Sequence, residues 1–312
     1  MSVIETNALS KRYSGGLRGE ATLAVDQITF GVEPGQIFGF LGPNGSGKTS
    51  TIGMLLGIIS PSAGTFRLFG ESTPRGIHSA RQRIGATLEY PNFYPYLSCR
   101  DNLKLVASVK GRDPKDVDEA LEVVGLTKRQ KTRFEACSLG MKQRLALGAT
   151  LLGDPELIIL DEPSNGLDPA GQREIRGIIQ SLGERGKTIF LSSHILHEVE
   201  RTCTHVAIIE QGRLVRQASV SEITTDRVVV GLRSDADLEV LRSGAAAFLL
   251  TKSATSVDDR VVVELEQEDL AGLNAFLASR GIFLSHLVRE RQTLESVFME
   301  LTSERSGFGE VS

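Results

Sequence analysis

The fold is decided by the stretch Gly42-Pro43-Asn44-Gly45-Ser46-Gly47-Lys48-Thr49, which fits the phosphate-binding pattern G-x-x-x-x-G-K-[ST]. Before it, residues 36–41 form a short apolar run typical of a buried strand, and after it residues 50–56 predict a helix. Glycines allow the backbone to curl so that several N–H groups point at one anion, and the start of the helix adds partial positive charge. The stretch therefore predicts a strand, a phosphate-binding loop and a helix in succession.

The side chains of this loop have separate predicted roles. Lys48 should reach the β- and γ-phosphates of a nucleoside triphosphate, and the Thr49 hydroxyl should bind Mg²⁺. The predicted nucleotide contacts are Gly42, Pro43, Asn44, Gly45, Ser46, Gly47, Lys48, Thr49 and Ser50. A glycine-rich turn that binds nothing is the alternative, but the Lys-Thr pair and both flanking elements favour a nucleotide site.

Length and composition narrow the class of protein. The chain has 312 residues, which suggests two domains, and its 40% hydrophobic content is typical of a globular protein. A formal charge of −4 argues against a general nucleic-acid binder, so we expect no nucleic-acid partner. Cys99, Cys137 and Cys203 are sparse and form no C-x-x-C pair, which suggests a reducing compartment. We find no signal peptide and no apolar run long enough to span a bilayer, and so expect a cytoplasmic protein.

The pattern along the chain predicts an α/β fold with a P-loop NTPase core. Residues from about 4 to 30 alternate like antiparallel strands, and residues 84–88 resemble a buried strand. A helical subdomain is expected between about 101 and 148. After the apolar run 157–160, strands and helices alternate, which predicts a parallel, doubly wound sheet.

A polar stretch at 219–226 suggests a domain boundary. We expect a nucleotide-binding domain over 1–220, a small α+β accessory domain over 226–302 and an unstructured tail over 303–312. The strands expected in the accessory domain are 228–232, 247–250, 261–265 and 283–288, and its helices are 236–241, 270–279 and 294–301.

Acidic residues at the end of the buried run 157–160 supply the rest of the predicted chemistry. Asp161 should lie at the ligand-binding edge of the parallel sheet and hold Mg²⁺, while Glu162 could activate the attacking water as general base. The alternative is that both carboxylates only cap the following turn. His194, at the end of another core strand, should lie on the same edge within reach of a γ-phosphate. A structural histidine is the alternative; a metal site with His197 lacks further ligands.

The segment Ser138-Leu139-Gly140-Met141-Lys142-Gln143-Arg144 lies upstream of Asp161. With the motifs above, it resembles the signature of ATP-binding cassette (ABC) transporter subunits, commonly Leu-Ser-Gly-Gly-Gln, in the variant found in bacitracin- and lantibiotic-type exporters. The Ser138 hydroxyl and Gly140 N–H, at the start of a helix, can still bind a γ-phosphate. The segment 294–298 resembles the closing helix of a small domain in the same group.

The resemblance, which covers residues 1 to about 220, carries further implications. It implies that Tyr13 stacks on adenine and that the loop 165–168, ending in Asp168, links two active sites. It also implies that two cassettes sandwich two ATP molecules head to tail, so that signature residues act on the nucleotide held by the partner. The second cassette is either the same chain or a different one.

One position departs from the family pattern. The family usually has Gln after the strand 84–88, whereas this chain has Glu89. An ionised carboxylate accepts hydrogen bonds but cannot donate them, so we expect Glu89 to remain a Mg²⁺-site and coupling residue with an altered role toward water. The aromatic stretch 90–97 that follows is either local packing or a docking groove for a helix of a membrane permease.

These features predict the Mg-dependent ATPase subunit of an ABC exporter for antibiotics, peptides or several drugs. It should bind ATP, pair with a second cassette, and lie on the inner face of the cell membrane beside a separate permease. The alternatives are a soluble ABC ATPase acting on ribosomes or DNA, an importer subunit, and a regulatory cassette with little turnover. The soluble ATPase is disfavoured because the chain has one cassette, no long heptads and no zinc pattern. The regulatory cassette is disfavoured because Glu162 and His194 are both present.

Overall fold

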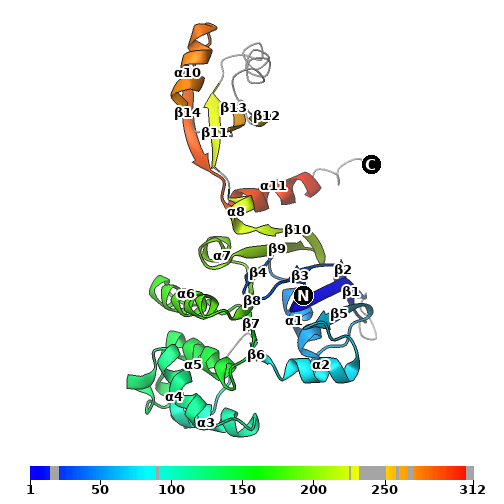
Figure 1. Cartoon of the computed structure of the whole chain (residues 1–312), viewed down its shortest axis with the longest axis vertical. Coiled ribbons are helices and arrows are strands. Elements are labelled where there is room, and N and C mark those ends of the chain that lie inside the picture. The colour runs from blue at the N-terminus through cyan, green and yellow to red at the C-terminus, as the bar shows by residue number, and fades with distance from the viewer. Residues whose placement is uncertain are drawn as a thin grey trace. The chain divides into compact units, whose positions relative to one another are not determined.

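The computed structural model describes residues 1–14, 21–88, 91–224, 226–231, 251–257, 260–265 and 270–306. The chain divides into two compact units. One comprises Met1–Val220 with the chain from Phe298, and the other comprises Ser221–Val297. Figure 1 shows the elements in chain order. No helix in the described ranges is both long and apolar enough to span a membrane.

A six-stranded sheet forms the centre of the first unit. Its order is β10 (Arg213–Ser219), β9 (His205–Glu210), β4 (Ile37–Leu41), β8 (Thr188–Ser193), β7 (Leu157–Asp161) and β6 (Ile84–Thr87). All neighbours are parallel except β10, which forms an antiparallel hairpin with β9. Every residue of β4, β7 and β8 is buried, as expected for strands covered on both faces. The predicted parallel core is confirmed.

The prediction that 84–88 is a buried strand was wrong in part. β6 ends at Thr87 and lies at the edge of the sheet, with β7 as its one neighbour. Ala86 is exposed, while Ile84 and Thr87 are only half-buried. Its apolar composition is therefore explained by one covered side, and not by burial on both.

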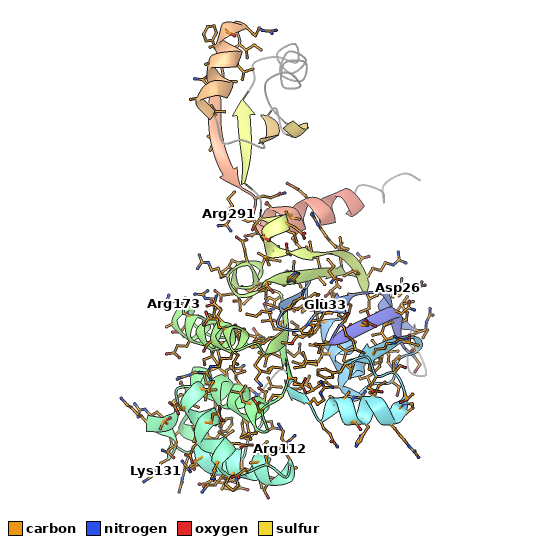
Figure 2. The ribbon with its side chains drawn as sticks, in the orientation of Figure 1. Asp26, Glu33, Arg112, Lys131, Arg173 and Arg291 are labelled. Carbon is orange, nitrogen blue, oxygen red and sulfur yellow. The ribbon has the colours of Figure 1, made fainter. Side chains whose placement is uncertain are left out.

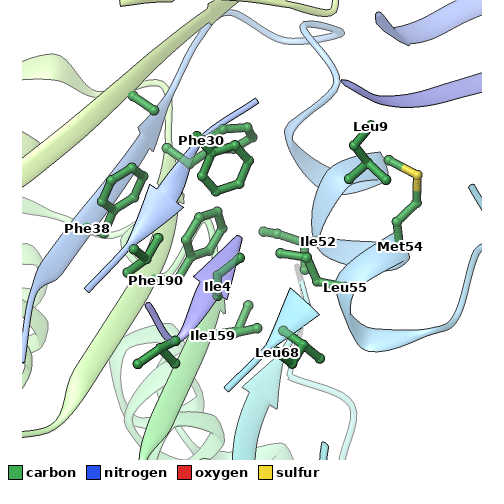
Figure 3. Packing of buried hydrophobic residues seen from close by; sticks show 14 of the residues in the cluster. Ile4, Leu9, Phe30, Phe38, Ile52, Met54, Leu55, Leu68, Ile159 and Phe190 are labelled. Carbon is green, nitrogen blue, oxygen red and sulfur yellow. The ribbon is translucent and has the colours of Figure 1, made fainter. Parts of the chain in front are cut away.

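A four-stranded antiparallel sheet packs beside the central sheet. It consists of β1 (Ile4–Tyr13), β2 (Thr22–Ile28), β3 (Gly31–Val32) and β5 (Ala63–Leu68). Phenylalanine rings join the two sheets: Phe30 lies 6.0 Å from Phe38 and 6.0 Å from Phe190, between ring centroids. Figure 3 shows these rings beside side chains of the first helix, such as Ile52. This core fixes the strand and helix on either side of the phosphate loop.

Helices cover both faces of the central sheet, with α6 and α7 on one side and α1 on the other (Figure 1). The helices of the first unit are α1 (Lys48–Leu56), α2 (Pro74–Arg81), α3 (Cys99–Val109), α4 (Lys115–Val123), α5 (Leu139–Leu151), α6 (Pro169–Glu184) and α7 (Leu196–Thr202). Short 3₁₀ turns, Thr127–Arg129 and Phe134–Ala136, precede α5, and α8 (Val220–Ile223) follows β10. The predicted helical subdomain corresponds to α3, α4 and α5. Exposed cations such as Arg112, Lys131 and Arg173 point outward (Figure 2).

The second unit contains one antiparallel sheet, ordered β12 (Thr251–Val257), β13 (Arg260–Leu265), β11 (Asp226–Gly231) and β14 (His286–Arg291). Its helices are α10 (Leu270–Ser279) and the start of α11 (Leu294–Ser306), where Leu294 and Val297 are buried. The helix expected at 236–241 and the strand expected at 247–250 lie outside the described residues. β12 was not predicted, and α11 continues to Ser306, beyond residue 303 where a tail was expected.

Candidate nucleotide-binding site

The phosphate loop connects β4 directly to α1, as its sequence predicts. Gly47 precedes α1 with φ 103°, in the left-handed region that disfavours other residues. A Cβ atom at Gly47 would also lie 2.3 Å from the carbonyl oxygen of Ala24, which is a severe clash. Glycine is therefore required here both for the backbone conformation and for the close approach of β2.

A cavity of about 550 Å³ opens over this loop. Its lining residues come from β2, from the phosphate loop and the start of α1, from the segment after β7 and from the position after β8. They are Ala24, Asn44, Gly45, Gly47, Lys48, Thr49, Ser50, Glu162, Asn165 and His194. Glu162 and His194 are thus brought together with most of the predicted loop residues, whereas Gly42, Pro43 and Ser46 do not line the cavity. Asn165 was predicted only as the start of the 165–168 loop, and Ala24 was not predicted because β2 is distant in sequence from the phosphate loop.

Lys48, Glu162 and His194 form a continuous polar chain in the cavity. Lys48 Nζ donates to the carbonyl oxygens of Gly42, at 2.7 Å, and Pro43, at 3.2 Å. The same Nζ lies 3.3 Å from Glu162 Oε1, and the two side chains are only 5% and 10% exposed. Glu162 Oε2 lies 2.8 Å from His194 Nδ1. Since burial weakens solvent screening, this charge arrangement is positioned to act strongly on an entering phosphate.

The neighbouring carboxylate Asp161 is held by a serine. Ser192 on β8 donates its hydroxyl proton to Asp161 Oδ1 at 2.5 Å. Asp161 Oδ2 is buried and has no hydrogen-bond partner among the described residues. A buried carboxylate oxygen without a partner and a threonine hydroxyl are oxygen donors of the kind Mg²⁺ prefers; Thr49 lines the cavity, whereas Asp161 is buried at the end of β7 and does not line it. The residues present therefore fit a Mg²⁺ ion.

The signature residues and Asp168 do not line this cavity. Ser138 is the N-cap of α5 and accepts a hydrogen bond from Met141 N at 3.3 Å, while Asp168 caps α6 through Gly171 N at 3.0 Å. Gly140 follows Ser138 in the first turn of α5. The signature helix contacts the 165–168 loop of its own chain, since a Cβ at Gly166 would lie 3.3 Å from a Leu139 methyl.

Two further predicted residues have different outcomes. The Tyr13 hydroxyl lies 3.2 Å from Ser50 Oγ at the start of α1, and Lys11 Nζ lies 5.1 Å from the centroid of the Tyr13 ring. This places a half-exposed ring beside the phosphate loop. Glu89, predicted for Mg²⁺ binding and catalysis, lies outside the described residues.

The aromatic stretch after Glu89 divides into packing and exposed residues. Phe93 makes an edge contact with the buried Phe134, with ring centroids 5.4 Å apart. Tyr94 and Tyr96 are 50% and 62% exposed, and their rings lie 5.9 Å apart. Local packing thus accounts for Phe93, while the two tyrosines form an exposed aromatic pair.

Comparison with known proteins places these features in context. Residues 25–165 match the family model described as ABC transporter. The chain is 38% identical over 310 residues to the bacitracin transport ATP-binding protein BcrA of Bacillus licheniformis, covering 96% of this chain and 97% of that protein. It is 39% identical over 231 residues to the Nod factor export ATP-binding protein I of Paraburkholderia xenovorans, covering 73% of this chain and 74% of that protein. The solved structure of CbiO1 from Clostridium perfringens, described as part of the ABC transporter complex CbiONQ, matches with a TM-score of 0.64 and 26% identity, covering 78% of this chain and 95% of that one.

Proposed function

The chain belongs to the family of ABC transporter ATP-binding proteins, and on that premise we propose that it hydrolyses Mg·ATP to drive export through a separate membrane permease. The observation that carries the proposal is the buried chain of Lys48, Glu162 and His194 in the cavity over the phosphate loop. A cassette that only bound nucleotide would have no need for a buried carboxylate beside the phosphate-binding lysine.

The geometry suggests how these residues act on ATP. In the described structure Lys48 donates to backbone carbonyls and lies beside Glu162. An entering triphosphate offers Lys48 a stronger, charge-assisted set of acceptors, so that Lys48 turns toward it and Glu162 Oε1 becomes available. Glu162 then accepts the proton of the attacking water, as a general base within hydrogen-bond reach does. His194 holds Glu162 Oε2 and keeps the carboxylate aimed at the reaction centre.

The proposed metal site uses one oxygen that lines the cavity and one that is buried at the end of β7. The Thr49 hydroxyl and Asp161 Oδ2 would hold Mg²⁺, with Glu89 as the additional ligand expected from the sequence. When bound, Mg²⁺ neutralises charge on the phosphates. The chain's own contribution is to orient Asp161 through the hydroxyl of Ser192.

We further propose a head-to-tail pair of cassettes. Ser138 and Gly140 lie at the N-terminus of the 13-residue helix α5, where backbone N–H groups favour an anion, yet they lie outside the cavity of their own chain. A second cassette supplies the nucleotide for this helix, and the 165–168 loop that contacts Leu139 links the two sites. Tyr13, beside the start of α1, is the proposed platform for adenine.

The export direction and the permease contact rest on two supports. Relatives that cover most of the chain are named for bacitracin transport and Nod factor export. Tyr94 and Tyr96 present an exposed aromatic pair, the composition favoured at protein interfaces. We propose that this pair receives a permease helix at the inner face of the membrane, and that the cargo is an antibiotic or peptide.

The test is purification of the tagged chain from membranes, with phosphate release measured on the complex. We expect a co-purifying membrane protein, ATP turnover, and ATP-dependent uptake of bacitracin, as a first probe, into inside-out vesicles. Substitution of Tyr94 and Tyr96 by Ser should release the membrane protein and leave turnover of the free chain intact. ATP turnover with no membrane partner would contradict transport, and uptake into right-side-out vesicles would contradict export.

A further inference from the structure

We propose that Ser192 is a positioning residue that fixes both carboxylates of the site at once. Its hydroxyl donates to Asp161 Oδ1 at 2.5 Å and accepts from the backbone N–H of Glu162 at 3.0 Å. One side chain thus holds the proposed metal ligand and the proposed general base. The inference rests on the proposed function, because it assigns a role within that same site.

The hydroxyl proton sets the orientation of Asp161. A serine hydroxyl has one proton to donate, and at 2.5 Å that proton is given to Asp161 Oδ1. The carboxylate is thereby held in one rotamer, in which Oδ2 is buried and has no partner among the described residues. Ser192 therefore selects which carboxylate oxygen is left for the metal.

The hydroxyl oxygen stabilises the backbone of Glu162. Glu162 has φ 50°, in the left-handed region that costs a non-glycine residue energy unless its surroundings hold it. The hydrogen bond from Glu162 N to Ser192 Oγ is such a restraint, and Ser192 itself is fully buried. Without it, the peptide can relax and move the Glu162 carboxylate away from Lys48 and His194.

The register of the sheet explains why Ser192 can reach both residues. β8 lies between β4 and β7, and Ser192 pairs with Asp161 on one side and with Phe40 on the other. A hydroxyl at this position is buried among apolar strand residues, where an unpaired polar group would be destabilising. The hydrogen bonds to Asp161 and Glu162 satisfy this hydroxyl and therefore explain why a serine is tolerated there.

The first test compares Ser192→Ala with Thr188→Val at the other end of β8. Thr188 is also buried and its hydroxyl accepts a hydrogen bond from Gly35 N at 3.0 Å, whereas the hydrogen bonds of Ser192 go to Asp161 and Glu162. We expect Ser192→Ala to lower kcat about 10- to 100-fold, with little change in KM for ATP. We also expect it to lower the affinity for Mn²⁺ by a similar factor, measured by EPR in the presence of ADP. Thr188→Val should lower thermal stability but leave both readouts unchanged.

A second variant separates hydrogen bonding from packing. Ser192→Cys keeps the shape of the side chain and leaves no cavity, but its larger sulfur is only a weak donor and acceptor. We expect the kcat and the Mn²⁺ affinity of Ser192→Cys to fall as they do in Ser192→Ala. The measurement on Ser192→Cys tests the proposal even if Ser192→Ala fails to fold. Wild-type values in Ser192→Cys, or an equal loss in Thr188→Val, would overturn the positioning role.

The two proposals can fail separately. A wild-type chain that bound Mn²⁺ with ADP but released no phosphate would refute the proposed ATPase function. The Mn²⁺ measurement on Ser192→Ala and Ser192→Cys would still decide whether this serine orients Asp161.

Discussion

Two ion pairs lie at opposite ends of the same strand, β7, and they differ in exposure and in geometry. At the amino end, Glu156 accepts two hydrogen bonds of 2.6 Å from Arg83, and both side chains are about half exposed. At the carboxyl end, Glu162 lies 3.3 Å from Lys48, and both are almost fully buried. The exposed pair has the better geometry, while the buried pair is longer and shared with His194.

The difference between the two pairs indicates that a short distance between charges does not by itself identify an ion pair that can act on a ligand. An exposed pair is screened by water and contributes about 0–1 kcal/mol, and bidentate geometry places the Arg83–Glu156 pair toward the upper end of that range. A buried pair loses hydration, and its charges act strongly on whatever enters between them. The contact of Lys48 with Glu162 is the longer one and lies at the cavity over the phosphate loop, so we propose that this pair is the one that acts on a phosphate.

The largest expected effect comes from removing the charge at the buried end. Glu162→Gln should lower kcat by about 10²- to 10⁴-fold, the range for loss of a general base, while ATP still binds. Phosphate release and equilibrium binding of ATP to the purified complex measure the two effects. The same substitution at the other end, Glu156→Gln, serves as the matched control and should leave turnover unchanged. Full turnover in Glu162→Gln would exclude the general-base role.

A smaller effect is expected from the cation of the buried pair. Lys48→Met removes a charge-assisted hydrogen bond to phosphate worth about 1.5–3 kcal/mol, so ATP affinity should fall roughly 10- to 100-fold. Fluorescent nucleotide titration measures this affinity. Arg83→Met is the comparison at the exposed end, and its affinity should match that of the wild type. Equal losses in the two variants would show that burial does not distinguish the pairs.

The exposed pair should matter only slightly for stability. Because half-exposed ion pairs are screened, Glu156→Gln should lower the free energy of unfolding by no more than about 1 kcal/mol at neutral pH. Urea denaturation followed by circular dichroism measures the change. A loss several times larger would mean that the bidentate geometry outweighs screening.

The smallest expected effect is the pH dependence of the stability difference between the wild type and Glu156→Gln. The hydrogen bond from Arg83 holds the pKa of Glu156 below its ordinary value of 4.5. A carboxylate with a lowered pKa contributes stability that is present above its unfolded value and is lost as pH falls through its folded value. The stability gap between the wild type and Glu156→Gln should therefore close below pH 4.5. A stability difference between the two proteins that stayed constant down to about pH 3 would contradict the charge-based account.

The parts of the site that could be predicted from sequence are those set by local rules. The strand, glycine loop and helix around Lys48 follow from a contiguous pattern, and Asp161 and His194 each end an apolar strand at one edge of a parallel sheet. These rules place residues without knowledge of which strands are neighbours.

The parts that could not be predicted depend on neighbours distant in sequence. Ser192 became important because β8 pairs with β7 in the register that sets it opposite Asp161. The edge position of β6 follows from sheet order, which its own composition does not encode. β12 was missed because Thr251–Val257 is mostly polar and short of the apolar alternation that indicates a strand.

The cap of the signature helix has a consequence for what that helix can recognise. The Ser138 hydroxyl uses one of its two lone pairs to accept from Met141 N, and its proton remains available to donate outward. A ligand that only donates hydrogen bonds would find no match for that proton, whereas a deprotonated oxygen would. We therefore expect this end of the helix, with its backbone N–H groups and the hydroxyl proton, to favour a ligand rich in acceptor oxygens over one that mainly donates.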